Sequence, residues 1–307
     1  MATGRFAPSP TGPLHVGNLR TALLAWLFAR SSGGRHLLRF EDLDAATARP
    51  EHEADQQRDL ATLGLDWDGE VVRQSDRFDH YRDALRQLDA TDRIYPCYCT
   101  RREIREAASA PHGDLPDGAY PGTCRRLTAA ERRRREASGR RPALRLRADG
   151  ERRRFVDRVL GPVEAMVDDF VVQRGDGTPA YQVAVVVDDD TQGVEEVVRG
   201  DDLAGSTPRQ LLVAELLGIE PPTYAHVPLA LNRDGARLAK RDGAVTMTEL
   251  AAVGVESSEV LAHLARSLGL SGPGERPTVA DLLERFDPAA VPTEPWILDP
   301  DDLLTPP

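Results

Sequence analysis

A segment near the N-terminus combines a histidine with the prolines and glycines of a tight turn. Residues 7–18 read Ala-Pro-Ser-Pro-Thr-Gly-Pro-Leu-His-Val-Gly-Asn. The apolar spacing over 16–30 predicts a helix, so His15 stands at a helix start. Free backbone N–H groups and the helix dipole favour phosphate there, and Gly17 lets a nucleotide lie close to the backbone. We interpret this turn, including Asn18, as a phosphate site; a capping or core histidine is the structural alternative.

Lysine occurs at a single position in the sequence. Lysine and arginine together number 39, and Lys240 is the one lysine among them. Arginine is a broad planar fork, whereas lysine is a compact point charge on a flexible stem, so a narrow phosphate site is one place where arginine cannot substitute. Lys240 lies in the polar segment 237–243, which reads Arg-Leu-Ala-Lys-Arg-Asp-Gly. A basic loop here, opposite the His15 turn, would clamp a triphosphate from both sides; chance placement of the lysine is the alternative.

Three cysteines, Cys97, Cys99 and Cys124, form a clustered and odd-numbered set. This pattern suits a reduced compartment and metal ligation better than a disulfide framework. Structural zinc takes four ligands, so three thiolates need a partner, and His112 is a chemically reasonable one. We expect a structural zinc ion, because no neighbouring carboxylate or base suggests hydrolysis. Buried free cysteines are the alternative.

The elements around these residues alternate as a parallel sheet requires. The predicted strands lie at 3–7, 36–40, 169–174, 180–187, 194–199 and 224–231. The predicted helices lie at 16–30, 50–63, 206–217 (capped by Ser206), 257–268 and 278–286. The alternation breaks after Ile94 and resumes near residue 168, so we interpret the segment between as an insertion.

Composition and charge exclude several classes of protein. The chain has 307 residues, of which 40% are hydrophobic and 29% charged. It has no run of 18 apolar residues and no secretory pattern at its start, so we expect a cytoplasmic protein with no membrane partner. The net charge of −11 argues against indiscriminate nucleic-acid binding, yet residues 125–158 hold 14 arginines against 5 acidic residues. Such a local concentration of positive charge is expected of a protein that binds a polyanion at one surface. The alternative is a solvated arginine-rich helix and hairpin.

The two motifs together resemble the signatures of class I aminoacyl-tRNA synthetases. Residues 15–18 are similar to the first signature, with Asn18 where its common form has a second histidine, and 237–241 are similar to the second, with Ala239 where serine is usual. The segments 5–12, 39–44 and 192–203 are similar to glutamyl-tRNA synthetases. The resemblance covers about residues 3–245.

This resemblance implies an α/β fold with a Rossmann-type parallel sheet. It divides the chain into a first half of the catalytic domain (1–94), a zinc-bearing, arginine-rich insertion (95–167) and a second catalytic half with the second signature loop (168–246). A short helical C-terminal region (247–307) follows.

The resemblance also implies that ATP, accompanied by Mg²⁺, activates L-glutamate to glutamyl-adenylate. His15 and Lys240 would stabilise the phosphates in the transition state, with Gly17 and Asn18 also against ATP. Six residues would surround the amino acid: Arg5, Ala7, Ser9, Glu41, Tyr181 and Arg199. The charges agree, because an arginine fork matches a carboxylate and a glutamate can hold the ammonium. Tyr120 would be the fourth zinc ligand.

Only about 60 residues follow the second signature, too few for the anticodon-reading region of full-length glutamyl-tRNA synthetases. The chain therefore resembles the shorter family of glutamyl-Q tRNA(Asp) synthetases, which attach glutamate to queuosine in the anticodon of tRNA(Asp). Two alternatives remain. One is a truncated synthetase that charges tRNA(Glu), and the other is an inert tRNA-binding paralogue, for which Ala239 is the only support.

Overall fold

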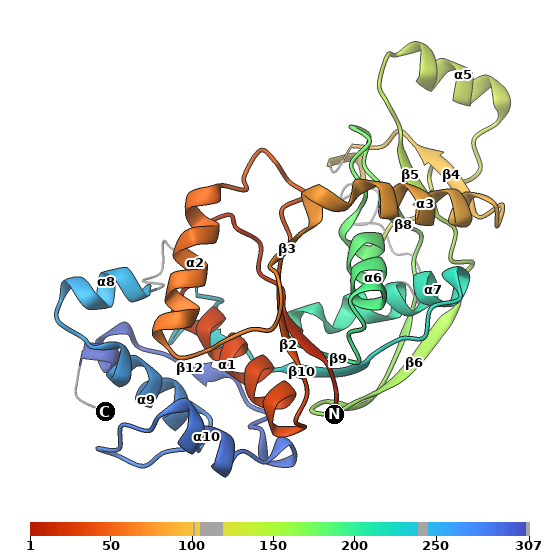
Figure 1. The fold of residues 1–307 in the computed structure, drawn as a ribbon. Helices are drawn as coiled ribbons and strands as arrows, with labels where there is room; N and C mark the ends of the chain where they lie inside the picture. The colour runs from red at the N-terminus through yellow and green to blue at the C-terminus, as the bar shows by residue number, and fades with distance from the viewer. Residues whose placement is uncertain (101, 105–118, 239–244, 305–307) are drawn as a thin grey trace.

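A seven-stranded sheet forms the centre of the computed structural model, which describes residues 1–100, 102–104, 119–238 and 245–304 (Figure 1). Its strand order is β3-β2-β1-β9-β10-β6-β7, and every neighbouring pair is parallel except β6 and β7. The strands are β1 (Gly4–Phe6), β2 (His36–Phe40), β3 (Val72–Arg73), β6 (Arg152–Asp157), β7 (Gly161–Met166), β9 (Glu196–Gly200) and β10 (Thr223–Val227). The predicted parallel α/β fold is confirmed.

The strand order places a crevice at the carboxyl end of β1. Strand β1 pairs with β2 on one side and with β9 on the other, although β9 follows it by almost two hundred residues. In open α/β sheets ligands bind where the order reverses in this way. The chain leaving β1 is the proline-rich turn that leads into α1.

Helices cover both faces of the sheet. The helices of the structure include α1 (Val16–Ser31), α2 (Pro50–Thr62), α3 (Phe78–Asp89), α5 (Ala129–Ala137), α6 (Tyr181–Thr191), α7 (Thr207–Leu217), α8 (Met247–Ala252), α9 (Ser257–Ser267) and α10 (Val279–Arg285), of which α1 and α7 pack against the sheet. Successive residues of β2 and β9 point to opposite faces. Leu38 and Val198 pack in the core around α1, whereas Leu37 and Val197 pack beside Leu211 of α7. No helix in the described ranges is both long and apolar enough to cross a membrane.

The predicted strand at 180–187 is wrong, because these residues form most of helix α6. Every residue from Val183 to Asp189 is buried, so the apolar run has no exposed face. Such a run does not distinguish a buried strand from a buried helix. Here α6 packs between α3 and α7, and this burial outweighs the strand preference of its valines.

Two boundaries also differ from the sequence predictions. Ser206 stands at the N-cap of α7, but its side chain makes no capping hydrogen bond, because a 3₁₀ turn at Asp201–Ser206 runs straight into the helix. The strand predicted over 224–231 is divided. Pro228 cannot donate to a ladder, so β10 ends at Val227, and β11 (Ala230–Leu231) pairs instead with β12 (Trp296–Ile297).

The predicted insertion contributes to two sheets. Strands β4 (Ile94–Cys97) and β5 (Ala143–Leu146) form an antiparallel sheet with β8 (Phe170–Gln173). Strands β6 and β7 instead extend the main sheet beyond β10. Helix α5, which carries four of the arginines, buries none of its residues and lies at the far end from α8 (Figure 1). The division of the chain into four parts stays a prediction.

His36, at the start of β2, should make stability depend on pH. Burial lowers the pKa of this histidine to about 4. In the unfolded chain His36 binds a proton as the pH drops below about 6.5, whereas in the folded chain it stays neutral until the pH is near 4. The free energy of unfolding therefore falls as the pH drops below about 6.5. We expect His36 to contribute about 2 kcal/mol of destabilisation between pH 7.5 and pH 5. Urea unfolding of wild type and His36→Leu at both pH values tests this; equal losses in the two proteins would contradict it.

Candidate active site

A cavity of about 480 Å³ opens at the carboxyl ends of β1, β2 and β9. Eight of the residues predicted to bind substrate line it: Arg5, Ala7, Ser9, His15, Asn18, Glu41, Tyr181 and Arg199. They come from three strand ends, the proline-rich turn and the first turns of α1 and α6. Gln56 of α2, which the sequence analysis missed, holds the turn by donating to the carbonyls of Ser9 and Gly12 at 3.2 and 2.7 Å.

His15 is the N-cap of α1. Its Nδ1 accepts the backbone N–H groups of Gly17 and Asn18 at 3.1 and 3.3 Å, and the Asn18 side chain accepts the His15 N–H in return. Burial lowers the pKa of His15, so the ring is neutral at pH 7. Because Nδ1 is an acceptor, the proton of the neutral ring must sit on Nε2. The Nε2–H of His15 is therefore available as a hydrogen-bond donor to a ligand in the cavity. His15 can thus cap the helix and bind a ligand at the same time.

Gly17 makes room for the imidazole ring. A Cβ atom at this position would lie 3.0 Å from two atoms of the His15 ring and 3.2 Å from the Cβ of Ala230. The residue is buried and does not line the cavity, unlike Asn18. The requirement for glycine here is thus one of packing behind the histidine.

Arg5 and Arg39 share a buried carboxylate. The Arg5 Nε lies 3.3 Å from Asp189 Oδ1, and the Arg39 Nη2 lies 2.9 Å from the same oxygen. Although burial opposes it, the two guanidinium groups hold the pKa of Asp189 below its usual value. Arg39 is fully buried and also approaches Glu41 at 3.5 Å. Asp189, at the end of α6, thus fixes Arg5 at the cavity wall.

Arg199 is held by four hydrogen bonds. Its Nη2 donates to Thr207 and Gln210, both at 2.8 Å, its Nη1 to Tyr181 at 3.3 Å, and its Nε to His226 at 3.1 Å. A guanidinium has five N–H groups. One N–H on Nη1 therefore remains without an acceptor among the described residues, and Arg199 lines the cavity.

His226 and Asp157 form a buried pair behind Arg199. His226 is the register partner of Arg199 on β10, and its Nδ1 lies 2.6 Å from Asp157 Oδ2. Its Nε2 accepts from Arg199, so the ring proton sits on Nδ1 and is donated to the carboxylate. Burial lowers the pKa of His226, which keeps the ring neutral. Asp157 lies in the part of the chain predicted as an insertion, and nothing in the sequence pattern pointed to it.

Glu41 contributes a carboxylate to the cavity. It follows β2 directly, and its backbone N–H donates to the carbonyl of Pro8, which brings the ends of β1 and β2 together. Burial raises the pKa of Glu41, while Arg39 and Arg5 oppose the shift. The cavity thus combines two fixed guanidinium groups with the Glu41 carboxylate, an arrangement complementary to an ammonium-bearing dicarboxylate, while its second carboxylate, that of Asp202, is paired with Arg237.

Lys240 and Ala239 lie outside the described residues, as does His112. The residues on either side of 239–244 lie beside the cavity. Arg237 bonds to Asp202, a lining residue, at 2.9 Å. The carbonyl of Val245 accepts from the N–H of Val16, in the first turn of α1. The role of Lys240 stays a prediction.

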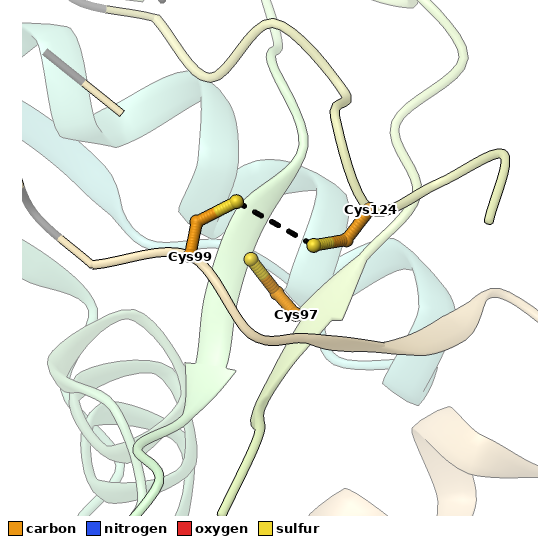
Figure 2. A group of neighbouring side chains, drawn as sticks. All are labelled: Cys97, Cys99 and Cys124. Atoms are coloured by element: carbon orange, nitrogen blue, oxygen red, sulfur yellow. Dashed lines mark hydrogen bonds between the residues drawn. The ribbon is translucent and has the colours of Figure 1, made fainter. Parts of the chain in front are cut away.

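The three cysteines converge at the end of β4 (Figure 2). Their sulfur atoms all lie within 4.8 Å of one another. The hydroxyl of Tyr120 lies 3.5 Å from the Cys97 sulfur and 3.9 Å from that of Cys99. Ligands about 2.3 Å from a tetrahedral zinc ion stand about 3.8 Å apart. The four groups therefore fit the size and softness of a zinc site.

Comparison with known proteins gives consistent results. A family model described as the catalytic domain of class I tRNA synthetases (E and Q) matches residues 1–304. A glutamyl-Q tRNA(Asp) synthetase of Nocardia farcinica is 57% identical, with 99% of this chain and 95% of that protein covered. A glutamate–tRNA ligase of Halorhodospira halophila is 43% identical over 97% of this chain and 65% of its own length. A crystal structure of a glutamate tRNA ligase from Elizabethkingia meningosepticum, in complex with its amino acid, superposes with a TM-score of 0.80 at 25% identity, covering 98% of this chain and 68% of that one.

Proposed function

Because the chain belongs to the glutamyl-Q tRNA(Asp) synthetase family of class I tRNA synthetases, we propose that it activates L-glutamate with ATP and transfers it to queuosine in tRNA(Asp). The observation that carries this proposal is the pairing of a phosphate-ready helix start with a cavity of two arginines and a glutamate. The higher identity to the Nocardia protein than to the glutamate–tRNA ligase favours this function over charging of tRNA(Glu).

Activation joins the glutamate α-carboxylate to the α-phosphorus of ATP, and pyrophosphate leaves. Positioning and charge stabilisation carry most of such a reaction. We assign to His15 the donation of its Nε2–H to a phosphate oxygen, and to the N-terminus of α1, with Asn18, the remaining phosphate contacts. Lys240 neutralises charge on the departing pyrophosphate, and Mg²⁺ arrives with ATP as part of the substrate.

The amino acid binds by charge complementarity. Arg5 and Arg199 receive its two carboxylates, and Glu41 receives its ammonium. Ala7 and Ser9 form the wall at the end of β1, and Tyr181 closes the opposite side. Glutamine lacks the second negative charge and aspartate is one methylene shorter, so both should leave one arginine without its partner.

This assignment is tested by pyrophosphate exchange with a panel of amino acids. We expect exchange with glutamate, and at least a hundredfold weaker exchange with glutamine and aspartate, because a site built to hydrogen-bond one substrate group strongly rejects an analogue that does not supply that group. Equal exchange with glutamine would show that the cavity does not read the second carboxylate. Absence of exchange with any amino acid would favour an inert tRNA-binding protein.

The cysteine cluster holds zinc in this proposal. Cys97, Cys99 and Cys124 supply thiolates and Tyr120 the fourth ligand, and the metal contributes folding energy. Zinc bound here would link the end of β4 to the segment after Tyr120, which lies outside the strands of the small sheet.

Metal analysis should find about one zinc ion per chain. Cys99→Ser is expected to lose most of the metal and to lower the melting temperature. Tyr120→Phe should weaken zinc binding while it keeps the ring on which the Arg145 guanidinium stacks, 3.7 Å from its centroid. His112→Ala should not change the zinc content. The opposite result for the last two variants would make His112 the fourth ligand, and a metal-free protein of unchanged stability would refute the site.

A further inference from the structure

A second cavity adjoins the first and is larger, about 810 Å³. It shares five lining residues with the first: Ala7, Ser9, Glu41, Tyr181 and Leu203. The two cavities therefore meet at the carboxyl ends of β1 and β2. From this junction the second cavity extends to Cys97 and Cys99 of the cysteine cluster. A volume of this size accommodates a ligand of nucleoside dimensions.

One face of the β4-β5-β8 sheet lines this cavity with three small side chains and one arginine. Cys97 pairs with Ala143 across β4 and β5, and Arg145 pairs with Val171 across β5 and β8. All four residues line the cavity. The alternate residues of β5 and β8, such as Leu146 and Val172, face the core on the other side. Ala143 and Val171 therefore form a low, apolar floor beside Arg145, and a planar base can stack on it.

Buried polar groups at the same cavity lack partners. Gln74 is completely buried; its Nε2 donates to Asp188 at 2.8 Å, but its Oε1 has no partner among the described residues. Arg145 is 7% exposed, and its Nε likewise has no partner in the described part of the chain. Buried polar atoms are nearly always paired, so an unpaired acceptor and an unpaired donor around one cavity point to a polar ligand.

We propose that the second cavity receives the acceptor nucleoside of the transfer step, with its base on the Ala143–Val171 floor and its vicinal diol at the junction. This proposal rests on the proposed function. The reactive carbonyl of glutamyl-adenylate lies in the first cavity, so the attacking hydroxyl must enter from a space continuous with it. There the hydroxyl oxygen forms an ester bond to the carbonyl carbon, the bond from that carbon to the phosphate oxygen breaks, and AMP leaves with the hydroxyl proton on its phosphate.

Two nucleosides of a tRNA carry a vicinal diol, queuosine and the 3′-terminal adenosine. We commit to queuosine, following the proposed function. Free queuosine and free adenosine are the two probes that separate these sources in a binding experiment, in which a non-reactive analogue of glutamyl-adenylate fills the first cavity and no tRNA is needed.

The test narrows the second cavity by enlarging one side chain of its floor, that of Val171. Val171 lies on β8, and strand β5 separates it from Cys97 on β4. The Val171→Phe substitution should therefore leave the zinc content unchanged. We expect glutamate-dependent pyrophosphate exchange within about twofold of wild type, and glutamate transfer to queuosine-containing tRNA(Asp) at least tenfold slower. Ala252 is an exposed residue of α8, and α8 lies far from the small sheet in Figure 1, so Ala252→Phe is the matched control and should leave both rates unchanged. Ala143→Leu replaces Val171→Phe if the latter does not fold.

Isothermal titration provides a readout independent of turnover. With the adenylate analogue bound, queuosine should bind to wild type and at least tenfold more weakly to Val171→Phe, whereas adenosine should not bind. Undiminished transfer by a folded, zinc-loaded Val171→Phe protein would overturn the proposal, and so would a parallel loss of exchange and transfer. Binding of adenosine in place of queuosine would also overturn it. Failure of exchange in the wild type would instead refute the proposed function itself.

Discussion

Replacing His15 by asparagine is expected to slow glutamate-dependent pyrophosphate exchange by about 10²–10³-fold without loss of stability. The loss follows from removing one donor aimed at charge that develops in the transition state. Asparagine is among the best N-cap residues, so it can still accept the N–H groups of Gly17 and Asn18. Its amide NH₂ group lies closer to the backbone than the imidazole Nε2, so it cannot donate at the same place.

The comparison with His15→Ala separates the two roles of this histidine. Alanine removes both the cap and the donor, so it should cost about 1 kcal/mol of folding free energy as well as the rate. Steady-state exchange and urea unfolding of the three proteins measure both quantities. An asparagine variant that is unstable but as active as wild type would show that His15 acts only as a cap.

Replacing Arg39 by methionine should destabilise the protein by about 3–5 kcal/mol, the range observed when one partner of a buried ion pair is removed. Arg39 is fully buried and lies among Asp188, Asp189 and Glu41. Without it, Asp189 keeps Arg5 as its cationic neighbour. The carboxylates left behind should also pull Arg5 away from the cavity wall, so glutamate binding should weaken.

The matched control is Arg58→Met on α2. Arg58 is largely exposed and pairs with Asp55 one turn earlier, a contact worth at most about 0.5 kcal/mol. Urea unfolding of both variants gives the two free energies. Similar costs for the buried and the exposed arginine would mean that the Arg39 cluster contributes no more than a surface pair.

The sheet could be predicted because its strands and helices alternate along the chain and because turns interrupt them clearly. Strand β2 and helix α1 were placed to within a residue or two. Helix α6 could not be predicted in the same way. Its valine-rich run suits a strand locally, and only its position between α3 and α7 makes it a helix.

The candidate site likewise contains residues that the sequence predicted and residues that it did not. Its lining residues follow strand ends and carry motifs, so they were found from the sequence. The groups that orient them were missed, because Asp189, His226 and Asp157 come from elements far away in the chain and belong to no motif. Ion pairs among buried residues are set by tertiary structure, which spacing alone does not encode.

The number of arginines in residues 125–158 overstates the positive charge available to a polyanion. Arg152 and Arg154 both form ion pairs with Glu164, and Arg158 forms one with Glu196.

The central claim is that glutamate is joined to an anticodon base. The most direct test measures transfer of labelled glutamate to three tRNA(Asp) substrates: intact with queuosine, with queuosine but trimmed of the 3′-terminal adenosine, and intact with guanosine in place of queuosine. We predict equal labelling of the first two and none of the third. Labelling that disappears with the 3′ adenosine and persists without queuosine would contradict the account.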